Sequence, residues 1–258
     1  MGLATDETWP ALEGEFVSGA GGLLCGINPE TTRVGDWAAR SEAGPSRDQN
    51  EDRWGHQCGV RFALADGMGG HSDGERAATI VRDGTLEGTT ETWPQLLLRL
   101  NDQVRHGHRT SGRSAGTTLV ALEVHHGRAT VVSVGDSRVY RCRSGRLEQL
   151  TEDHTLRGDL MSAGIDADRH ADARESRGLT SYLGIDPARL RIDVIDVPLA
   201  AGDRFLLCSD GIHDMVPPHT MAALLARPRC DDVVGGLFDA RTAAGGRDDA
   251  TAIVLHVT

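Results

Sequence analysis

Three apolar, strand-like segments of this sequence run directly into an aspartate that neighbours a glycine. They lie at residues 62–67, 131–136 and 205–211. A carboxylate at the end of a buried strand is held on a rigid element and still reaches a cleft. Several such carboxylates repel one another unless cations lie between them. The repeated arrangement therefore favours a sheet-based fold whose strand ends form an acidic, cation-binding cleft.

Two further acidic clusters accompany these segments: residues 50–52 precede the first, and residues 247–249 precede the final strand-like stretch. Carboxylate oxygens without a cluster of histidine or cysteine are ligands of hard cations, which favours Mg²⁺ or Mn²⁺ over zinc or copper. The neighbouring glycines allow the backbone to approach an ion or to present a carbonyl to it. The predicted metal site thus draws on segments far apart in the chain.

Asp-Gly is also a common turn dipeptide, which gives these aspartates a simpler interpretation. The chain has four such pairs, beginning at Asp66, Asp73, Asp83 and Asp210. The second and third are expected to be helix-cap or surface residues, and Asp66 or Asp210 taken singly is a turn residue. Their joint position at strand ends favours a metal site, to which the pattern alone assigns no reaction.

Hydrophobic periodicity predicts both strands and helices. Helical spacing covers residues 73–86, 93–108, 220–226 and 232–244, and strand-like segments cover residues 60–65, 117–124, 129–134, 138–143, 146–150, 192–197, 204–208 and 250–257. Short turns between successive strands predict hairpins, and residues 192–197 are expected to pair with residues 204–208. The pattern indicates an α+β fold with antiparallel sheets covered by helices, not a doubly wound parallel sheet.

The length of 258 residues suits one large domain or two small ones, and no shift in composition marks a second domain. Residues 1–32 are rich in glycine and weakly patterned, so we expect an N-terminal extension that is in part a flexible linker. Residues 33–258 are expected to form a single folded domain.

The charge balance argues against broad nucleic-acid binding. The chain has 27 basic residues, all arginine, and 38 acidic residues, for a net charge of −11, whereas nucleic-acid binding requires a basic surface. Five cysteines without a Cys-x-x-Cys pair predict neither a disulfide framework nor a zinc ribbon, which suits a cytoplasmic location. No secretory signal is expected at the N-terminus, and no apolar run reaches the ~18 residues of a membrane span.

Seven short motifs, in order along the chain, resemble those of one protein family. They are RDQNED (47–52), DGMGGH (66–71), GTT (116–118), GDSR (135–138), LTEDH (150–154), SDG (209–211) and DDAT (248–251). From about residue 33 to the end, the chain resembles the metal-dependent protein phosphatases, the PPM or type 2C serine/threonine phosphatases. The resemblance implies two antiparallel β-sheets packed as a sandwich with helices on both outer faces, a four-layer αββα architecture.

The resemblance also implies a centre of two Mn²⁺ or Mg²⁺ ions. Asp66 is similar to the carboxylate that bridges the two ions. The Gly67 carbonyl, and Glu51 directly or through water, are similar to the groups around one ion. Asp210 and Asp248 are similar to the ligands of the other ion.

Three further roles follow from the resemblance. Asp136 is similar to the ligand of a third, weaker ion in bacterial members, Arg47 to a phosphate clamp, and Asp52 to a residue that orients a metal-bound water or Arg47. Two ions that share a water lower its pKa, and the resulting hydroxide attacks phosphorus without a phosphoenzyme. A surface ion pair with Asp48 or Glu51 is the alternative for Arg47, although such pairs contribute little.

The chain departs from the animal members of the family at one important position. Met68 stands where they carry a histidine discussed as the general acid, so the leaving-group proton has to come from water or another group. His71 lies nearby and is open to a cap role, and His154 is expected to make a structural hydrogen bond. Asp249 either joins the metal site or only fixes its loop. Residues 155–178 are interpreted either as a flap beside the site or as a solvated helix and loop.

The function implied by the resemblance is hydrolysis of phosphoserine and phosphothreonine in proteins, by a bacterial enzyme that opposes a Ser/Thr kinase. The abundance of Arg, Ala and Gly without lysine suits a GC-rich bacterial genome. One alternative is a catalytically silent relative that binds phosphoproteins or regulates a partner. A second is a structural divalent-ion binder, for which Arg47 would be dispensable.

Overall fold

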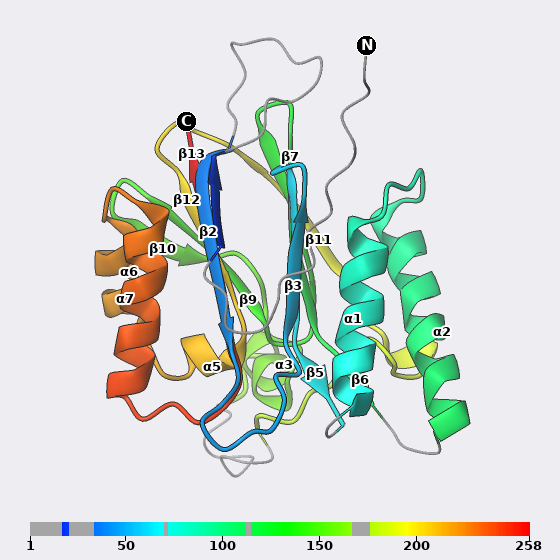
Figure 1. Ribbon diagram of the computed structural model, residues 1–258. Coiled ribbons are helices and arrows are strands. Elements are labelled where there is room, and N and C mark those ends of the chain that lie inside the picture. Colours follow the sequence, from blue (N-terminus) through cyan, green and yellow to red (C-terminus); the bar gives the residue numbers. More distant parts are fainter. Residues whose placement is uncertain (1–16, 21–33, 70–71, 112–114, 167–175) are drawn as a thin grey trace, which may run out of the picture.

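The computed structural model describes residues 17–20, 34–69, 72–111, 115–166 and 176–258. Its centre is a pair of antiparallel sheets between two layers of helices (Figure 1). The six-stranded sheet has the order β1 (Val17–Ala20), β2 (Val34–Glu42), β13 (Ala250–Val257), β12 (Arg204–Cys208), β9 (Arg138–Arg143), β10 (Arg146–Gln149). The five-stranded sheet has the order β11 (Asp193–Pro198), β8 (Arg128–Val134), β7 (Leu119–His125), β4 (Arg61–Ala65), β3 (Arg53–Gln57). The predicted α+β sandwich with helices on both outer faces is confirmed.

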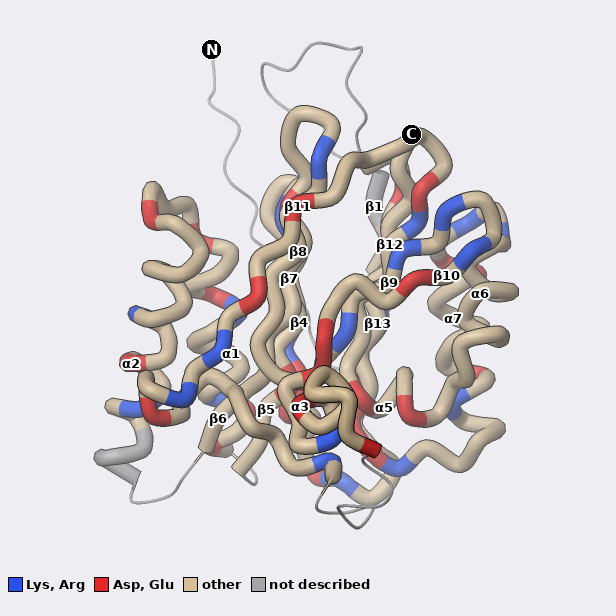
Figure 2. Tube along the Cα trace, turned by 180° about the vertical axis from the view of Figure 1, so that it is seen from behind, with Lys and Arg blue, Asp and Glu red and all other residues tan. Residues whose placement is uncertain are grey.

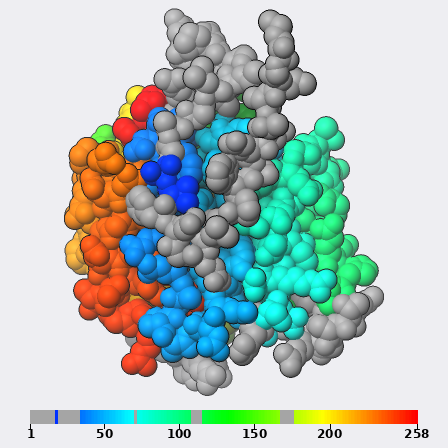
Figure 3. Space-filling model, viewed as in Figure 1, coloured from blue at the N-terminus to red at the C-terminus, as the bar shows by residue number. Residues whose placement is uncertain are grey.

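The helices form the two outer layers. One layer is α1 (Ser72–Leu86) and α2 (Trp93–Ser111), and the other contains α5 (Asp210–His213), α6 (Pro218–Leu225) and α7 (Cys230–Ala243). Figure 3 shows the orange α6 and α7 region and the cyan-to-green α1 and α2 region on opposite flanks of one face. The connection from β10 to β11 carries α3 (Leu156–Ser162) and the short 3-10 helix η1 (Pro187–Arg189). A small ladder of β5 (Gly67–Met68) and β6 (Gly116–Thr117) lies beside α1.

Three hydrophobic layers hold the sandwich together. Because successive side chains of a strand point to opposite faces, Phe62 packs between the sheets while Ala63 packs under α1 and α2. In the other sheet, Phe205 packs between the sheets while Leu206 packs under the C-terminal helices. Both faces of each sheet are therefore covered, which explains why residues 205–208 are apolar at every position.

One predicted strand pairing is wrong. Residues 193–198 pair with β8 in the five-stranded sheet, whereas residues 204–208 pair with β9 and β13 in the six-stranded sheet. The connection between them passes from one sheet to the other: Leu199 N–H donates to the Gly127 carbonyl beside β8, and Gly202 N–H donates to the Val257 carbonyl at the end of β13. The short loop resembles a hairpin in sequence, but it is a corner between the two sheets.

Most of the predicted extension lies outside the described residues. Within it, Val17–Ala20 forms β1 and pairs with β2 at the edge of the six-stranded sheet. The domain boundary near residue 33 therefore remains a prediction. The sequence patterns also did not predict β2 and β3, whose polar and charged residues interrupt the alternation of apolar side chains.

Candidate metal centre

The predicted site residues come together at one end of the sandwich. Charged positions of both signs gather at this end, around α3 and α5 (Figure 2). An open pocket of about 320 Å³ is lined by Arg47, Glu51, Asp66, Gly67, Met68, Gly69, Thr118, Asp136, Arg177, Leu179, Asp210, Asp248 and Asp249. The pocket thus includes every predicted site residue except Asp52, which lies behind it.

Asp66 is fixed by hydrogen bonds to the start of the neighbouring strand. Its N–H donates to Thr118 Oγ1 at 3.0 Å, and its carbonyl accepts from the Thr118 N–H at 2.9 Å. The Thr117 hydroxyl donates to the same carbonyl at 2.8 Å. Thr118 also hydrogen-bonds Ser137, at 2.7 Å between hydroxyl oxygens, next to Asp136. The Gly-Thr-Thr motif therefore links the backbones that carry two of the pocket carboxylates.

Two glycines after the pocket aspartates are required by close backbone packing. A Cβ on Gly67 would lie 2.4 Å from the Gly74 carbonyl oxygen, and a Cβ on Gly211 would lie 1.9 Å from the Asp249 carbonyl oxygen. Both contacts are with backbone, which cannot move aside as a flexible side chain would. The Asp-Gly pairs at 66 and 210 thus bring separate segments to the pocket, beyond any role in a turn.

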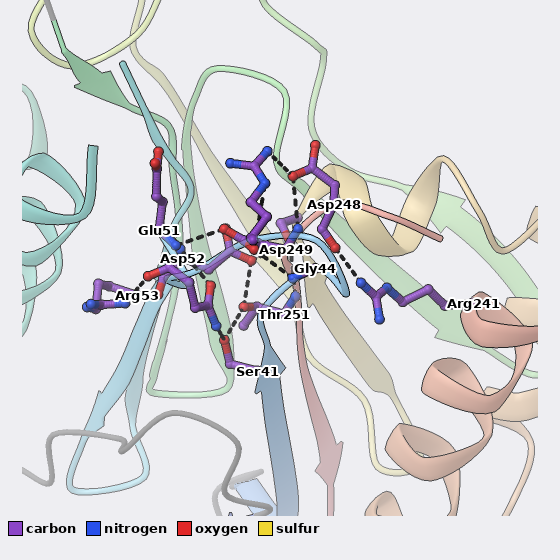
Figure 4. Close-up of polar contacts among 12 residues, drawn as sticks. Ser41, Gly44, Glu51, Asp52, Arg53, Arg241, Asp248, Asp249 and Thr251 are labelled. Carbon is purple, nitrogen blue, oxygen red and sulfur yellow. Dashed lines mark hydrogen bonds and ion pairs between the residues drawn. The ribbon is translucent and has the colours of Figure 1, made fainter. Parts of the chain in front are cut away.

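Asp249 fixes the loops of the pocket. Its Oδ1 accepts from the Gly44 N–H and its Oδ2 accepts from the Glu51 N–H, each at 2.8 Å (Figure 4). The side chain is 5% exposed. One carboxylate therefore joins the loop before β13 to the loop before β3, which confirms the loop-fixing interpretation of this residue.

Asp52 is buried beneath the pocket at 2% exposure. Its Oδ2 accepts hydrogen bonds from the Ser209 hydroxyl at 2.8 Å and from the Thr251 hydroxyl at 2.7 Å. Its Oδ1 is buried without a hydrogen-bond partner among the described residues. Burial raises the pKa of Asp52 to about 6, against the effect of these two hydrogen bonds.

Three carboxyls of the pocket lining, those of Asp66, Asp136 and Asp210, also have raised pKa values. Burial first, and then the charges of Asp52, Asp210 and Asp136, raise the pKa of Asp66 well above its usual range. Burial and the charges of Asp136 and Asp248 raise the pKa of Asp210 to about 7. The pKa of Asp136 rises to about 6, mainly through burial. A group of buried carboxyls this close together is stabilised either by protonation or by bound cations.

The donor set fits hard divalent cations in chemistry and burial. It consists of carboxylates around one pocket that Gly67 also lines, with an unpartnered carboxylate oxygen on Asp52 behind it. In the described part of the chain, no three acidic, histidine or cysteine side chains converge on a single ion position as they stand. One reason is visible: Asp248 is turned toward Arg47, with which it forms an ion pair. Ligation therefore requires side-chain rotation, of Asp248 in particular.

The structure describes His154 and Met68 but not His71. His154 is fully buried; its Nδ1 accepts from the Gly135 N–H at 3.1 Å, and its Nε2 lies 2.8 Å from Asp193 Oδ2. The predicted structural role of His154 is confirmed. Met68 lines the pocket, and His71 lies outside the described residues.

The sequence patterns did not single out Arg177 and Leu179 of the pocket lining. Arg177 belongs to the stretch 155–178 that was interpreted as a flap or a solvated loop, and Leu179 follows it directly. Nothing in the local sequence distinguishes Arg177 from the other arginines of this stretch. Its place at the pocket depends on contacts of the surrounding backbone with α3.

The fold and the carboxylate-lined pocket together define a metal-dependent phosphatase architecture, and the chain belongs to the protein phosphatase 2C family. The model of that family matches residues 40–231. The chain is 34% identical over 242 residues to the serine/threonine protein phosphatase PstP of Mycobacterium tuberculosis, covering 88% of this chain and 46% of PstP. It thus spans about half the length of this mycobacterial relative.

Two further similarities concern proteins that the chain matches along nearly their whole length. The serine/threonine phosphatase stp of Listeria monocytogenes is 31% identical over 237 residues, which cover 84% of this chain and 94% of that protein. A crystal structure of the PstP catalytic domain in complex with two manganese ions superposes with a TM-score of 0.74 at 30% identity, covering 88% of this chain and 98% of that domain. No helix among the described residues is long and apolar enough to cross a membrane.

Proposed function

We propose that this chain is a metal-dependent phosphoprotein phosphatase that hydrolyses phosphoserine and phosphothreonine. The observation that carries the proposal is the convergence of Asp66, Asp136 and Asp210, with raised pKa values, on one pocket that also contains Arg47. The relatives PstP and stp are named serine/threonine phosphatases, which supports the same activity here.

The residues that would hold the metal ions are those that the motifs indicated. Asp66, the Gly67 carbonyl and Glu51 would surround one Mn²⁺ or Mg²⁺ ion, and Asp210 and Asp248 would bind a second. Asp136, beside Asp210 in the pocket, would contribute to a third. Metal ions bound there supply Lewis acidity toward the phosphoryl group and lower the pKa of a bound water toward neutrality.

The chain's own residues position the phosphate and the attacking water. Arg47 is 38% exposed at the pocket, and a guanidinium can donate two parallel hydrogen bonds to a phosphate. The free Oδ1 of Asp52 is an acceptor for a water proton, while Ser209 and Thr251 hold its other oxygen in place. Thr118 holds the backbone of Asp66 at the pocket through two hydrogen bonds.

The biological setting belongs to the proposal as well. We expect a bacterial signalling enzyme that acts in the cytoplasm on a Ser/Thr kinase and its phosphorylated substrates. The described cysteines Cys58, Cys142, Cys208 and Cys230 are free thiols, which suits a reducing compartment. Cys208 is completely buried in β12, and none of the described cysteines lines the pocket.

The direct test is turnover of p-nitrophenyl phosphate with Mn²⁺, with Mg²⁺ and after chelation, followed by a panel of phosphopeptides. Metal-dependent hydrolysis of phosphoserine and phosphothreonine peptides is expected, and activity that survives chelation would contradict the mechanism. A catalytically silent, phosphoprotein-binding relative would bind the phosphopeptides without turnover. A structural ion binder would bind Mn²⁺ equally well after Arg47→Gln, and it would neither hydrolyse nor bind the phosphopeptides.

A further inference from the structure

Arg177 is, with Arg47, one of the two arginines among the described residues that line the pocket. It belongs to the lining together with Leu179, whose neighbours connect to α3. The backbone on both sides of Arg177 is fixed: the Ser176 carbonyl accepts from the Arg157 N–H at 2.8 Å, and the Gly178 carbonyl accepts from the Leu156 N–H at 3.0 Å. The start of α3 therefore holds the Cα of Arg177 in position, while its side chain remains 72% exposed.

The guanidinium of Arg177 has one carboxylate partner that the structure identifies. Its NH1 donates to Asp214 Oδ2 at 3.2 Å. Asp214 follows α5, and its Oδ1 lies 3.3 Å from His213 Nδ1, while His213 Nε2 lies 3.0 Å from the Asp136 carbonyl oxygen. The hydrogen bond from His213, followed by charge interactions that include Arg177, lowers the pKa of Asp214. Asp214 is therefore an anionic partner of Arg177 beside the His213 side chain.

The ion pair between Arg177 and Asp214 is exposed and therefore weak. The Arg177 side chain is 72% exposed and that of Asp214 is 35% exposed, and exposed pairs of this kind contribute little because water and salt screen them. An anionic group on a bound substrate can replace Asp214 as the partner of Arg177 at small cost. Asp214 itself repels such an anion, so the two side chains act on it in opposite directions.

The charges of the pocket lining indicate what Arg177 is suited to bind. Arg47 and Arg177 are the two cations among the described lining residues, against six carboxylates. Arg47 is engaged with Asp248 and Asp249 of the pocket wall. The ion-pair partner of Arg177 is Asp214, which does not line the pocket and is not one of the proposed metal ligands. The Arg177 side chain is thus placed to bind an anionic group beside the phosphorylated residue and not the phosphate that is hydrolysed.

We propose that Arg177 is a specificity-determining residue that binds an acidic side chain next to the phosphorylated serine or threonine of the substrate, exchanging Asp214 for that group. This inference rests on the proposed function and specifies its substrate class: phosphoproteins in which a carboxylate, or a second phosphate, lies within a few residues of the reacting phosphate.

The test uses matched phosphothreonine peptides and steady-state kinetics. One set of peptides carries a single aspartate at one of the two positions before or the two positions after the phosphothreonine. A second set carries asparagine at the same positions. A third set carries phosphoserine there. The wild-type chain with Mn²⁺ is expected to favour at least one aspartate peptide in kcat/KM, through KM, by about fivefold, the size of one charged contact at an exposed site.

Three variants separate this role from a structural one. Arg177→Gln should reduce the preference to below about twofold, and Arg177→Glu should reverse it, because the sign of the local charge changes. Asp214→Asn should increase the preference, since it removes the competing partner. Arg189→Gln is the matched control: Arg189 is an exposed arginine of η1 that does not line the pocket, and its variant should keep the wild-type ratio.

Each outcome decides between the two proposals. If the wild-type chain hydrolyses neither p-nitrophenyl phosphate nor the peptides with Mn²⁺, the proposed function fails and this inference with it. If hydrolysis is metal-dependent but neither an aspartate position nor phosphoserine is favoured, or the preference persists in Arg177→Gln, the function stands and the role of Arg177 is overturned. A preference for the phosphoserine arm alone would identify a second phosphate, not a carboxylate, as the group bound.

Discussion

Arg47 and Asp248 form an ion pair at the pocket, although 201 positions separate them in the chain. The pair joins the residue proposed to bind phosphate with a residue proposed to bind metal. Since the side chains are 38% and 47% exposed, the pair is weak and can open when a cation and a phosphate enter. We therefore expect the proposed binding of metal and of phosphate to be coupled through this contact.

Replacing Arg47 should separate the two binding events. Arg47→Gln removes both the competing partner of Asp248 and a positive charge near the ions, so we expect Mn²⁺ to bind about threefold more tightly. Loss of the guanidinium should at the same time lower kcat/KM by about 10²-fold, because a preorganised donor to the phosphoryl oxygens is gone. Titration calorimetry on the metal-free protein measures the first effect, and p-nitrophenyl phosphate turnover measures the second.

Arg146→Gln is the control for that experiment, since Arg146 is exposed on β10 and does not line the pocket. Its Mn²⁺ affinity and activity should match the wild-type values. Unchanged activity in Arg47→Gln would show that Arg47 only closes the pocket and does not bind the phosphate.

Asp66→Asn should abolish Mn²⁺-dependent activity while it stabilises the metal-free fold. Asp66 is buried among like charges, which raise its pKa, so the neutral amide removes repulsion at nearly constant volume. Thermal unfolding in the presence of a chelator is expected to show an increased Tm, and the stabilisation by Mn²⁺ seen in the wild-type chain should shrink. If Asp66→Asn has a lower Tm than the wild-type chain in the presence of the chelator, the argument that the pocket carboxylates repel one another without metal is contradicted.

The metal-free protein should lose stability as the pH rises from about 4 to above 7. The folded-state pKa values of Asp52 and Asp136 are raised to about 6 and that of Asp210 to about 7, above the ordinary value near 4. In this pH range the folded state binds more protons than the unfolded state. The stability that these bound protons contribute is fully present below pH 4 and is lost as the three carboxyls ionise in the folded state.

Thermal melts across this pH range with a chelator present should show Tm falling by about 5 °C or more. Saturating Mn²⁺ should remove most of the fall, because the cations replace the protons. A flat profile without metal would show that the carboxyls ionise without penalty in the folded state.

Gly211→Ala should disrupt both stability and metal binding. The added Cβ would lie 1.9 Å from the Asp249 carbonyl oxygen, and since the backbone must shift, we expect a loss of about 2 kcal/mol or more in the free energy of unfolding. Gly235→Ala is the matched control: in α7 no atom lies within 4 Å of the added Cβ, and alanine should stabilise the helix by about 0.5–1 kcal/mol. Equal Mn²⁺ affinities for the two variants would contradict the role given to Gly211.

The sequence predicted well those elements whose residues carry a regular pattern. The strand at residues 250–257 and the helix at residues 73–86 agree with β13 and α1 within one residue. The acidic strand ends also indicated the correct pocket. The pairing of residues 192–197 with 204–208 was wrong because a five-residue connection looks the same whether it joins neighbours or crosses between sheets.

Other features of the site depend on long-range contacts that no local pattern contains. Asp52 directly follows the pocket residue Glu51, yet it is buried and bound to Ser209 and Thr251, which lie 157 and 199 positions away in the chain. The contact of Arg177 with Asp214 likewise requires the fold that brings α3 and α5 together. Sequence reasoning identified the residue types of the pocket, and the structure assigned their partners.

The anchoring of the pocket by Asp249 has a consequence for biosynthesis. The carboxylate that holds the Gly44 and Glu51 amides immediately precedes β13, an interior strand of the six-stranded sheet. A nascent polypeptide that has left the ribosome only as far as α7 lacks both this anchor and the strand that separates β2 from β12. We therefore expect the pocket to form only after residue 257 has been synthesised, so that shorter nascent chains lack the proposed activity.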